Sequence, residues 1–399
     1  MRRSSVAACC LLVAATLCVE AARAQDFEPN EQKVSRQLDM LDGEFNQARA
    51  QMVWCDSLGR IWIANVDRHT GLLEPANGKG VLVDAAALST ADMQLTYNGP
   101  EWVSTAAGDR IVYTKFPVDK PHTLGNARLA SARETAPNTW AVELLPKGLA
   151  RNAPYGSQDA DDPRPRISYV GLNGRHYWRD LDDPASEELL PSLPASPRSV
   201  RFVVGARAVV YPLVVDGLSQ VFRYDLDSKQ LEQLTFDEGD KDLETAPWIW
   251  QAPELGGAET LLTVVDYSEL RFYVRTVNAQ GATVWIRTVS HAFGTAEKVT
   301  SPEPFVYGGR SYVFLAVASQ ANGFPSDIWL VNIDEAAPMK RRLNDDRRLR
   351  ARIDPEVFVT DAGPYIYYNR YNATKVPGKP YCRTCAEGLY RAHTGLPPP

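Results

Sequence analysis

The chain has 399 residues, of which 44% are hydrophobic and 23% are charged. This globular balance excludes a disordered chain and supplies enough apolar material for one large core or two medium cores. The formal net charge of −6 argues against nucleic acid as the main partner, because phosphate binding requires a basic face.

The first 24 residues have the features of a secretory signal peptide. Arg2 and Arg3 precede an apolar run over residues 6–19, and the small-residue pattern Ala22-Arg23-Ala24 follows. This order predicts cleavage before Gln25 and a secreted or periplasmic protein. The run is too short to span a bilayer comfortably, and no second run of that length follows. We therefore expect no membrane span in the mature chain.

Three cysteines remain after the signal peptide, at Cys55, Cys382 and Cys385. In an oxidising compartment the spacing Cys382-x-x-Cys385 predicts a small local disulfide, because no βαβ pattern surrounds it as in a redox centre. No second ligand pair is spaced for zinc, so no metal or cofactor is expected. Cys55 is then either a small buried side chain or the partner of one of the other two.

Short runs rich in β-branched and aromatic residues recur after residue 50 between Gly, Pro, Asn and Asp clusters, which predicts an all-β fold. Residues 30–50 differ, because Val34, Leu38, Leu41 and Phe45 have helix-like spacing and predict a short helix. The expected organisation is a signal peptide over 1–24, an N-terminal extension with this helix over 25–51, and one β domain over 52–399.

Three sequence elements repeat along the β domain. One is a turn followed by an apolar strand, as in residues 107–113 and 308–314, and another is an apolar strand that runs into a polar turn, as in residues 61–67 and 328–334. The third opens each unit with a proline. Its copies are Gly99-Pro100-Glu101-Trp102, Ala246-Pro247-Trp248, Ser301-Pro302-Glu303-Pro304-Phe305 and Asp354-Pro355-Glu356-Val357-Phe358, with Asp162-Pro163-Arg164 as a looser copy and Pro197 opening one more unit.

Six such starts, at spacings of about 35 to 65 residues, predict a β-propeller of six four-stranded blades, with seven blades as the alternative. The first repeat lacks an opening strand and the last repeat lacks an outer strand. We therefore expect the two termini to share a blade and close the ring, which removes the exposed edges of an open sheet.

The stretch Val221 to Thr235, with Tyr224-Asp225-Leu226-Asp227-Ser228 followed by Leu231 and Leu234, resembles the repeat of the TolB-like propellers, also described as WD40-like PD40 repeats. The resemblance extends over roughly residues 52–396 and implies a ring of blades. TolB itself is not expected, because the chain has no room for the α/β domain that precedes its propeller. Size, export signal and blade style also resemble those of secreted propeller hetero-Diels–Alderases from natural-product pathways.

The innermost strand of a propeller blade borders the central channel, so equivalent positions of the repeats meet there. Glu101, Glu303 and Glu356 are therefore the candidate catalytic carboxylates. We expect them to be joined at one mouth of the channel by Glu244, Asp161 or Asp162, and Arg164. Converging carboxylates can hold a cation or act as general acid and base. A repeated Pro-Glu can equally be a structural blade-start motif, and both interpretations stay open.

Large aromatic residues lie at or just after the same starts. The candidate ligand-binding residues are Trp102, Trp248, Phe305 and Phe358, together with Arg164, because flat rings near a channel mouth can stack on a sugar or a planar molecule. Packing between blades is the alternative use of these rings. Asn372-Ala373-Thr374 is a glycosylation sequon that matters only in a eukaryotic secretory pathway.

The sequence has no nucleophile elbow, phosphate loop or dinucleotide fingerprint. It predicts an exported monomeric propeller that binds a small molecule, a glycan or a protein at one face of the central channel. The alternative is a secreted enzyme with its pocket at the channel mouth, either a cyclase like the hetero-Diels–Alderases or a glycan-cleaving hydrolase or lyase. A cyclase of that kind works by orientation and by hydrogen bonds to a polarised carbonyl, so it needs no catalytic motif.

Overall fold

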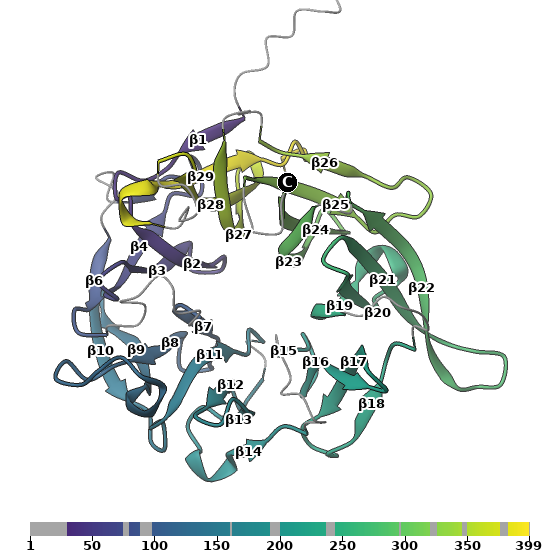
Figure 1. The fold of residues 1–399 in the computed structure, drawn as a ribbon, viewed down its shortest axis with the longest axis horizontal. Coiled ribbons are helices and arrows are strands. Elements are labelled where there is room, and N and C mark those ends of the chain that lie inside the picture. The colour runs from purple at the N-terminus through teal and green to yellow at the C-terminus, as the bar shows by residue number, and fades with distance from the viewer. Residues whose placement is uncertain are drawn as a thin grey trace, which may run out of the picture.

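The repeated apolar runs of the sequence form antiparallel strands, and these strands group into seven sheets around one axis in the computed structural model (Figure 1). The structure describes residues 30–74, 80–87, 98–159, 162–191, 200–236, 244–294, 297–319, 325–344, 349–375 and 382–398. The sheet pairing confirms the predicted β-propeller and shows seven blades, the alternative number, in place of six.

The first four blades follow one another along the chain, and in each the first strand is innermost. Blade 1 contains β2 (Met40–Asn46), β3 (Gln51–Asp56), β4 (Ile61–Val66) and β5 (Leu73–Glu74), with β6 (Val81–Asp84) beside β4. Blade 2 contains β7 (Glu101–Val103), β8 (Arg110–Lys115), β9 (Arg128–Ala136) and β10 (Thr139–Leu144). Blade 3 contains β11 (Arg151–Gly156), β12 (Arg166–Gly171), β13 (His176–Asp180) and β14 (Glu188–Leu189). Blade 4 contains β15 (Arg201–Phe202), β16 (Ala208–Val215), β17 (Leu218–Asp225) and β18 (Leu231–Gln233).

The last three blades complete the ring. Blade 5 contains β19 (Thr245–Ala252), β20 (Ala258–Val265), β21 (Glu269–Val277) and β22 (Thr283–Ala292). Blade 6 contains β23 (Lys298–Tyr307), β24 (Arg310–Ala318), β25 (Ser326–Asn332) and β26 (Lys340–Arg342). Blade 7 contains β27 (Arg350–Thr360), β28 (Gly363–Asn372), β29 (Ala386–His393) and β1 (Glu31–Lys33). Short 3-10 turns occur at η1 (Leu124–Asn126), η2 (Pro184–Ser186), η3 (Pro253–Leu255) and η4 (Arg383–Cys385).

The ring closes because the N-terminal strand β1 pairs antiparallel with β29 and becomes the outer strand of blade 7. This confirms that the two termini share a blade. The sequence predicted a propeller that starts at residue 52 and has no opening strand in its first repeat. The structure supplies this strand as β2, which lies before residue 52. Residues 31–33 and 40–46 therefore belong to the ring.

The short helix predicted over residues 30–50 is wrong, because this segment forms β1 and β2. An inner strand is packed between two neighbouring blades, so both of its faces carry apolar side chains and the alternation typical of a half-buried strand disappears. Met40 and Leu41 illustrate this, since they are consecutive, both buried, and belong to different core clusters. The helix-like spacing of the apolar residues that suggested the helix, Val34, Leu38, Leu41 and Phe45, is therefore a coincidence.

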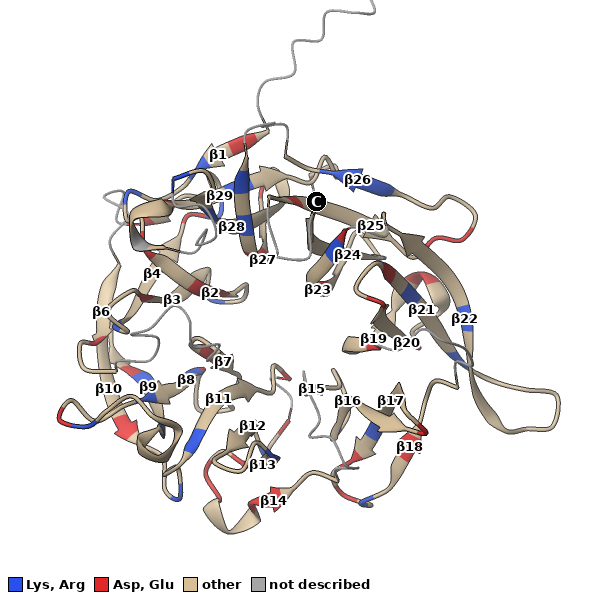
Figure 2. Ribbon diagram, in the orientation of Figure 1, with Lys and Arg blue, Asp and Glu red and all other residues tan. Residues whose placement is uncertain are grey.

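Apolar cores lie between adjacent blades. Cys55 of blade 1 packs in one cluster with Trp102 and Ile111 of blade 2, and Trp250 of blade 5 packs with Val313 of blade 6. The basic run of β26 lies on the outer rim of the ring, away from the axis (Figure 2). In the described part of the chain, no helix has the length and hydropathy needed to cross a lipid bilayer.

A buried ionic group holds the closing strand in place. Arg352 of β27 donates to both carboxylate oxygens of Glu31, at 3.0 and 2.9 Å, and the Tyr368 hydroxyl donates to the same carboxylate at 2.8 Å. The Glu31 side chain is only 3% exposed. Burial alone would raise the pKa of Glu31, but Arg352 outweighs it and holds the pKa below its ordinary value.

We predict that Glu31→Ala lowers the free energy of unfolding by about 3–5 kcal/mol, because it removes the closer of the two carboxylates paired with the buried Arg352 guanidinium and leaves only Asp327, at 3.5 Å. Since the pKa of Glu31 is lowered, its stabilisation is present above pH 4.5 and is lost as the pH falls through the folded pKa. Chemical denaturation at pH 7 measures the loss. Glu335→Ala, at an exposed glutamate, is the matched control and should change stability by less than about 0.5 kcal/mol. Equal effects of the two substitutions would contradict the role of Glu31.

Candidate functional site

Five inner strands share the same local irregularity near their first residues. In each, two consecutive residues lie opposite one residue of the next strand, which is a β-bulge. The paired residues are Asp42-Gly43, Ala153-Pro154, Ala246-Pro247, Ser301-Pro302 and Asp354-Pro355. The first residue of every pair has a positive φ between 46° and 50°. Proline suits the second position, because a bulge does not require its missing N–H for the ladder.

The bulge determines which side chain faces the axis. The inner strand is the edge strand of its sheet, so the regular pleat directs its side chains toward the two adjacent blades. The bulge changes this direction and turns the residue that follows it toward the channel. Glu101 of β7 and Arg201 of β15 occupy the corresponding place in the two blades without a described bulge. The seven channel-facing residues, one from each blade, are Glu44, Glu101, Tyr155, Arg201, Trp248, Glu303 and Glu356.

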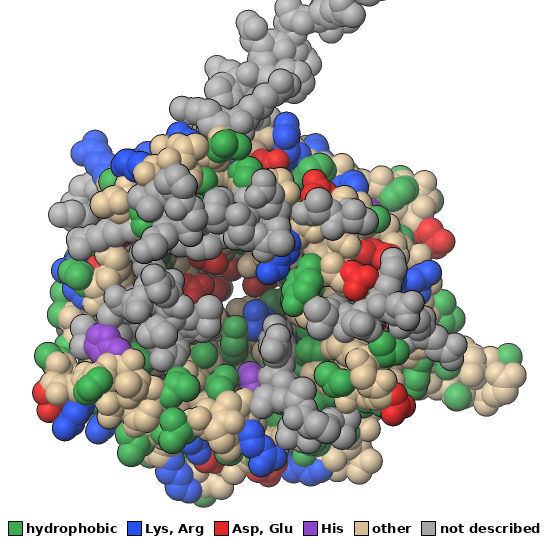
Figure 3. Space-filling view, viewed as in Figure 1, with side chains coloured by type: hydrophobic (Ala, Val, Ile, Leu, Met, Phe, Trp, Pro, Cys, Tyr) green, Lys and Arg blue, Asp and Glu red, His purple; other side chains and the backbone are tan. Residues whose placement is uncertain are grey.

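These residues line a cavity of about 760 Å³ at the centre of the ring. Acidic positions are visible on the inner strands β2 and β7 (Figure 2), and the space-filling view shows acidic side chains gathered at the central hollow beside basic ones (Figure 3). The bulge residues Asp42 and Asp354 add two further carboxylates to the lining. A cavity of this size is in the range of small-molecule binding sites.

The charges around the cavity are arranged asymmetrically. Six carboxylates come from four consecutive blades, 6, 7, 1 and 2, and we call them the acidic arc: Asp42, Glu44, Glu101, Glu303, Asp354 and Glu356. The channel-facing positions of the three other blades carry Tyr155, Arg201 and Trp248 instead, and blade 3 adds Asp159 and Arg166 to the lining. A purely structural motif would repeat in every blade. The asymmetry therefore favours the interpretation that the Pro-Glu positions serve a site.

The charge of Arg201 acts on the carboxylates at the two ends of the arc, Glu303 in blade 6 and Glu101 in blade 2. Burial in the channel raises the pKa of Glu101 to about 8, against the opposing charge of Arg201 and the Asn98 amide, which donates to Glu101. Burial also raises the pKa of Glu303 to about 7, again opposed by Arg201. Small changes in pH near neutrality therefore change the charge at both ends of the arc.

The remaining members of the arc lie among other carboxylates. Burial and then the charge of Glu356 raise the pKa of Glu44 well above its ordinary value. Burial and Glu303 do the same for Glu356, and burial with Asp42 raises the pKa of Asp354 to about 8. The pKa of Asp42 is raised by burial too, although the backbone N–H of Gly99 donates to this carboxylate. Part of the acidic arc is consequently protonated at pH 7.

Arg201 is held by two aromatic rings. Its guanidinium carbon lies 4.1 Å from the centre of the Tyr155 ring and 5.1 Å from the centre of the Trp248 ring. Burial acts to lower the pKa of Arg201, but Tyr155, Glu303 and Glu101 outweigh it, so the pKa is raised and the side chain stays charged. Cation–π contacts of this kind restrict the position of a guanidinium, which keeps five N–H donors for other partners.

The predicted site residues separate into two groups. Glu101, Glu303, Glu356 and Trp248 line the cavity. Trp102, Phe305 and Phe358 instead pack between blades, because they occupy regular positions after the bulge or blade start. The indole N–H of Trp102 donates to the backbone oxygen of Glu44 at 3.1 Å, and the Phe358 ring lies 5.3 Å from that of Phe45. Phe305 packs against a core cluster that joins Phe314 of blade 6 to Ile366 of blade 7.

The other residues expected at the channel mouth are elsewhere. Arg164 is exposed in the connection between β11 and β12 and lies 3.4 Å from Asp227. Its Pro-Arg motif does not open a blade, since the inner strand of blade 3 is β11, which starts earlier. Asp162 is ion-paired with Arg166 at 2.6 Å, and Glu244 accepts a hydrogen bond from Thr235 at 2.5 Å. Asp161 lies outside the described residues.

Several cavity residues escaped the sequence interpretation. Asp42 and Glu44 were placed in the predicted helix, and Arg201 has no Pro-Glu motif before it. The signal for Tyr155 was present in Ala153-Pro154-Tyr155, which copies the pattern of Ala246-Pro247-Trp248. His176 of β13 also lines the cavity, and burial lowers its pKa to about 4, so it is neutral at pH 7.

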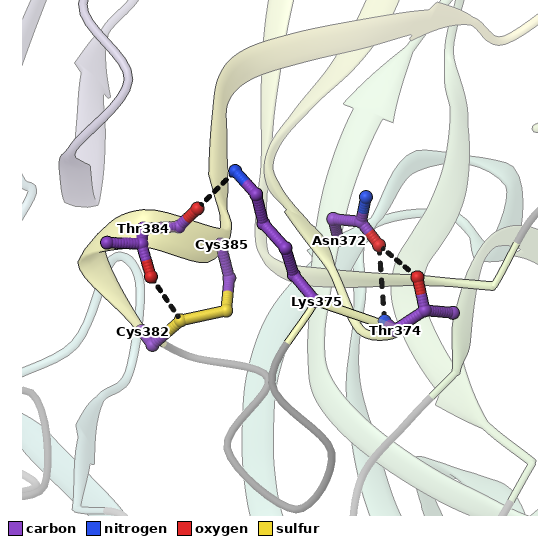
Figure 4. Close-up of a disulfide and its surroundings, with 6 residues drawn as sticks. All are labelled: Asn372, Thr374, Lys375, Cys382, Thr384 and Cys385. Carbon is purple, nitrogen blue, oxygen red and sulfur yellow. Dashed lines mark hydrogen bonds between the residues drawn. A yellow bond between two sulfur atoms is a disulfide. The ribbon is translucent and has the colours of Figure 1, made fainter.

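The two disulfide cysteines and the sequon lie on blade 7, and the third cysteine lies on blade 1; none of them lines the cavity. Cys382 and Cys385 form the predicted disulfide across η4, and Lys375 donates to the backbone oxygen of Thr384 in the same turn (Figure 4). The side-chain oxygen of Asn372 accepts a 2.7 Å hydrogen bond from the Thr374 hydroxyl. Cys55 is buried in β3, and its thiol donates to the backbone oxygen of Leu41 at 3.4 Å.

The arrangement can bind a positively charged or hydrogen-bonding molecule, and it can donate and accept protons near neutral pH. Among the described residues, no three or more His, Cys, Asp or Glu side chains are grouped so that they could hold a metal ion. The chain is a seven-bladed β-propeller, and its candidate site is an acidic cavity on the axis of the ring.

No family model matches the sequence, and no curated protein matches it. Among solved structures, the chain is similar to the β-propeller domain of Cps50 (Swd1) from Myceliophteria thermophila, known from a crystal structure. The identity is 9%, the match covers 80% of this chain and 91% of that chain, and the TM-score is 0.47. The assignment of seven blades to this chain comes from its own strand pairing.

The raised pKa values predict that the folded protein loses stability as the pH rises. A carboxyl group with a pKa of about 8 when folded and about 4.5 when unfolded binds more protons in the folded state between these values. The free energy of unfolding therefore falls by about 1.4 kcal/mol per pH unit for each extra proton. Buried His176 has the opposite effect on the free energy of unfolding below pH 6.5, because its pKa is lowered to about 4 in the folded state. The measurement is therefore made above pH 6.5.

We expect the melting temperature to fall between pH 7 and pH 8.5, and we expect Glu101→Gln to reduce that fall because glutamine stays neutral. Differential scanning calorimetry at constant ionic strength measures both. Glu335→Gln, at an exposed glutamate, should behave as the parent protein. If Glu101→Gln and the parent lose stability equally over this range, Glu101 is not protonated in the folded state and the electrostatic description of the arc is wrong.

Proposed function

We propose that this protein is an exported β-propeller that binds a small cationic molecule in its central channel. The observation that carries the proposal is the acidic arc, six carboxylates that face one cavity from four consecutive blades, with Arg201 as the one cation at the channel-facing ring positions. Carboxylates crowded in a partly desolvated space repel one another unless protons or a cation neutralise them. A bound amine would supply that neutralisation.

The cavity supports a small molecule rather than a large partner. Its volume of about 760 Å³ suits a compact ligand, and the arc lies on the inner strands, where a folded protein or a broad glycan surface cannot reach all six carboxylates. Trp248 and Tyr155 add aromatic surface next to the carboxylates. Such a wall favours a ligand with a short apolar segment beside its charge.

Export and the TolB-like relationship are part of the same proposal. Export is supported by the signal-like sequence of residues 1–24, which lie outside the described residues, and an oxidising compartment suits the disulfide of Cys382 and Cys385. The repeat around Tyr224 to Ser228 supports the TolB-like relationship. Detection of the protein outside the cytoplasm with Gln25 as its first residue would test the first of these.

The binding test uses 1,5-diaminopentane as the probe and isothermal titration calorimetry as the measurement. We expect tighter binding at pH 8.5 than at pH 6.5, because the diamine must displace protons from carboxyl groups such as Glu101, whose pKa is about 8. Each proton displaced strengthens the apparent affinity by at most about tenfold per pH unit. 1-Pentanol, which lacks the charges, should not bind detectably.

The residue test combines Glu101→Gln with Glu303→Gln. We expect this double variant to weaken diamine binding by about tenfold or more, since two charge-assisted contacts are lost. Glu335→Gln is the control for the loss of an exposed carboxylate and should bind as the parent protein does. The proposal is wrong if the parent protein does not bind the diamine at pH 8.5, or if the double variant binds it unchanged.

A second candidate function is glycan cleavage, and one observation favours it. Burial and Glu303 raise the pKa of Glu356 well above its ordinary value, whereas burial raises the pKa of Glu303 to about 7. An acid and a base with separated pKa values are what general acid–base hydrolysis of a glycosidic bond requires. We expect such an enzyme to release the phenol from an aryl glycoside, and Glu356→Gln or Glu303→Gln to reduce this rate about 100-fold or more. Retention of the full rate in both variants would exclude the arc as its catalytic site.

A further inference from the structure

We infer that the channel ligand is amphoteric: its amine binds the acidic arc and its carboxylate binds Arg201, as in a free amino acid or a short peptide. The inference rests on the proposed function and defines the ligand class of the same cavity. It starts from the one residue of the channel-facing ring whose charge is opposite to that of the arc.

Two aromatic rings flank the Arg201 guanidinium where it lines the cavity. Tyr155 and Trp248 lie within 4.1 and 5.1 Å of its guanidinium carbon, measured to the ring centres. A guanidinium has five N–H donors, so one that contacts aromatic rings can still donate to a planar acceptor. A carboxylate matches those edges, because two parallel N–H groups can donate to its two oxygens.

The hydrogen-bonding capacity of Arg201 is not used up by the described protein. Nη1 donates to the backbone oxygen of Val200 at 3.4 Å, and the side chain interacts with the Tyr155 hydroxyl. No carboxylate among the described residues lies within ion-pair distance of it. Arg166 and Arg352 show the contrast, since each is almost fully buried and pairs with a carboxylate at 2.6 and 2.9 Å. Arg201 therefore has donors left for a ligand.

The fold sets Arg201 opposite the centre of the acidic arc. The arc covers blades 6, 7, 1 and 2, so its midpoint lies between blades 7 and 1, where Glu356 and Glu44 stand. Arg201 belongs to blade 4, which faces that midpoint in a closed ring of seven blades. A molecule lying across the channel thus meets carboxylates at one end and a guanidinium at the other. An amine and a carboxylate at opposite ends of a small ligand complement this field.

A simpler role for Arg201 is to offset the charge of the arc without touching a ligand. The two roles predict opposite results for matched ligands. If Arg201 only offsets charge, removing it strengthens the binding of every cationic ligand. If Arg201 receives a carboxylate, removing it weakens the binding of ligands that carry one and strengthens the binding of those that do not.

The test compares L-lysine with 1,5-diaminopentane, which differ only by the α-carboxylate, in the parent protein and in Arg201→Met. Titration calorimetry at pH 8.5 measures all four affinities. We expect Arg201→Met to weaken lysine binding about tenfold or more and to strengthen diaminopentane binding severalfold, so that the two changes have opposite signs. Stronger binding of both ligands to the variant would overturn the inference and leave Arg201 as a counter-charge.

Arg201→Lys provides the test if Arg201→Met does not fold, as judged by its melting curve. Lysine at this position keeps the positive charge and loses the forked donor pair. We expect L-lysine binding to weaken severalfold and diaminopentane binding to stay unchanged. The inference is wrong if both affinities are unchanged in Arg201→Lys. If the parent protein binds neither L-lysine nor 1,5-diaminopentane, the proposed function itself is wrong. This outcome differs from the one that overturns only the role of Arg201, in which the parent protein binds.

Discussion

The pairing of β1 with β29 is the constraint on which the rest of the molecule depends. Seven sheets share an axis only if the last blade is joined to the first, and this joint is made by a three-residue strand with a buried carboxylate, Glu31, held by Arg352 and Tyr368. Without it, blade 7 would end on the open edge of β29, and the N-terminal segment would no longer tie blade 7 to blade 1. The axial cavity exists because the ring is closed, since inner strands from all seven blades line it.

Within the closed ring, a repeated backbone device is combined with side chains that do not repeat. The bulge with positive φ recurs in five inner strands and always directs the next residue to the axis. Positive φ at residues such as Ala153 and Asp354 is unfavourable outside glycine, and such strain is commonly kept where it positions functional groups. Because the frame is constant, changing a single residue per blade is enough to convert a symmetric ring into one with an acidic half and an opposing guanidinium.

This concentration of carboxylates lowers the stability of the folded protein when no ligand is bound. The raised pKa values of Glu101, Glu303 and Asp354 show that the ionised forms are less stable in the channel than in water. Stability and site chemistry are therefore linked, because the protons that relieve the repulsion are the ones that a bound cation would displace. Arg201, flanked by Tyr155 and Trp248, reduces this cost at both ends of the arc, where its charge acts on Glu101 and Glu303.

The sequence by itself determined the β-propeller class, the Cys382–Cys385 disulfide and the convergence of Glu101, Glu303 and Glu356. Each depends on a short-range pattern. The fold class follows from strand composition, the disulfide from two cysteines separated by two residues, and the convergence from a proline before the inner strand. Only the tertiary structure decided the number of blades, the strand over residues 40–46, and the separation of Trp248 in the cavity from Trp102 and Phe358 between blades. Those outcomes depend on long-range pairing and on where a bulge interrupts the pleat. Arg201 shows the limit most clearly, since its importance comes from standing opposite the acidic arc, a relation between blades far apart in the chain.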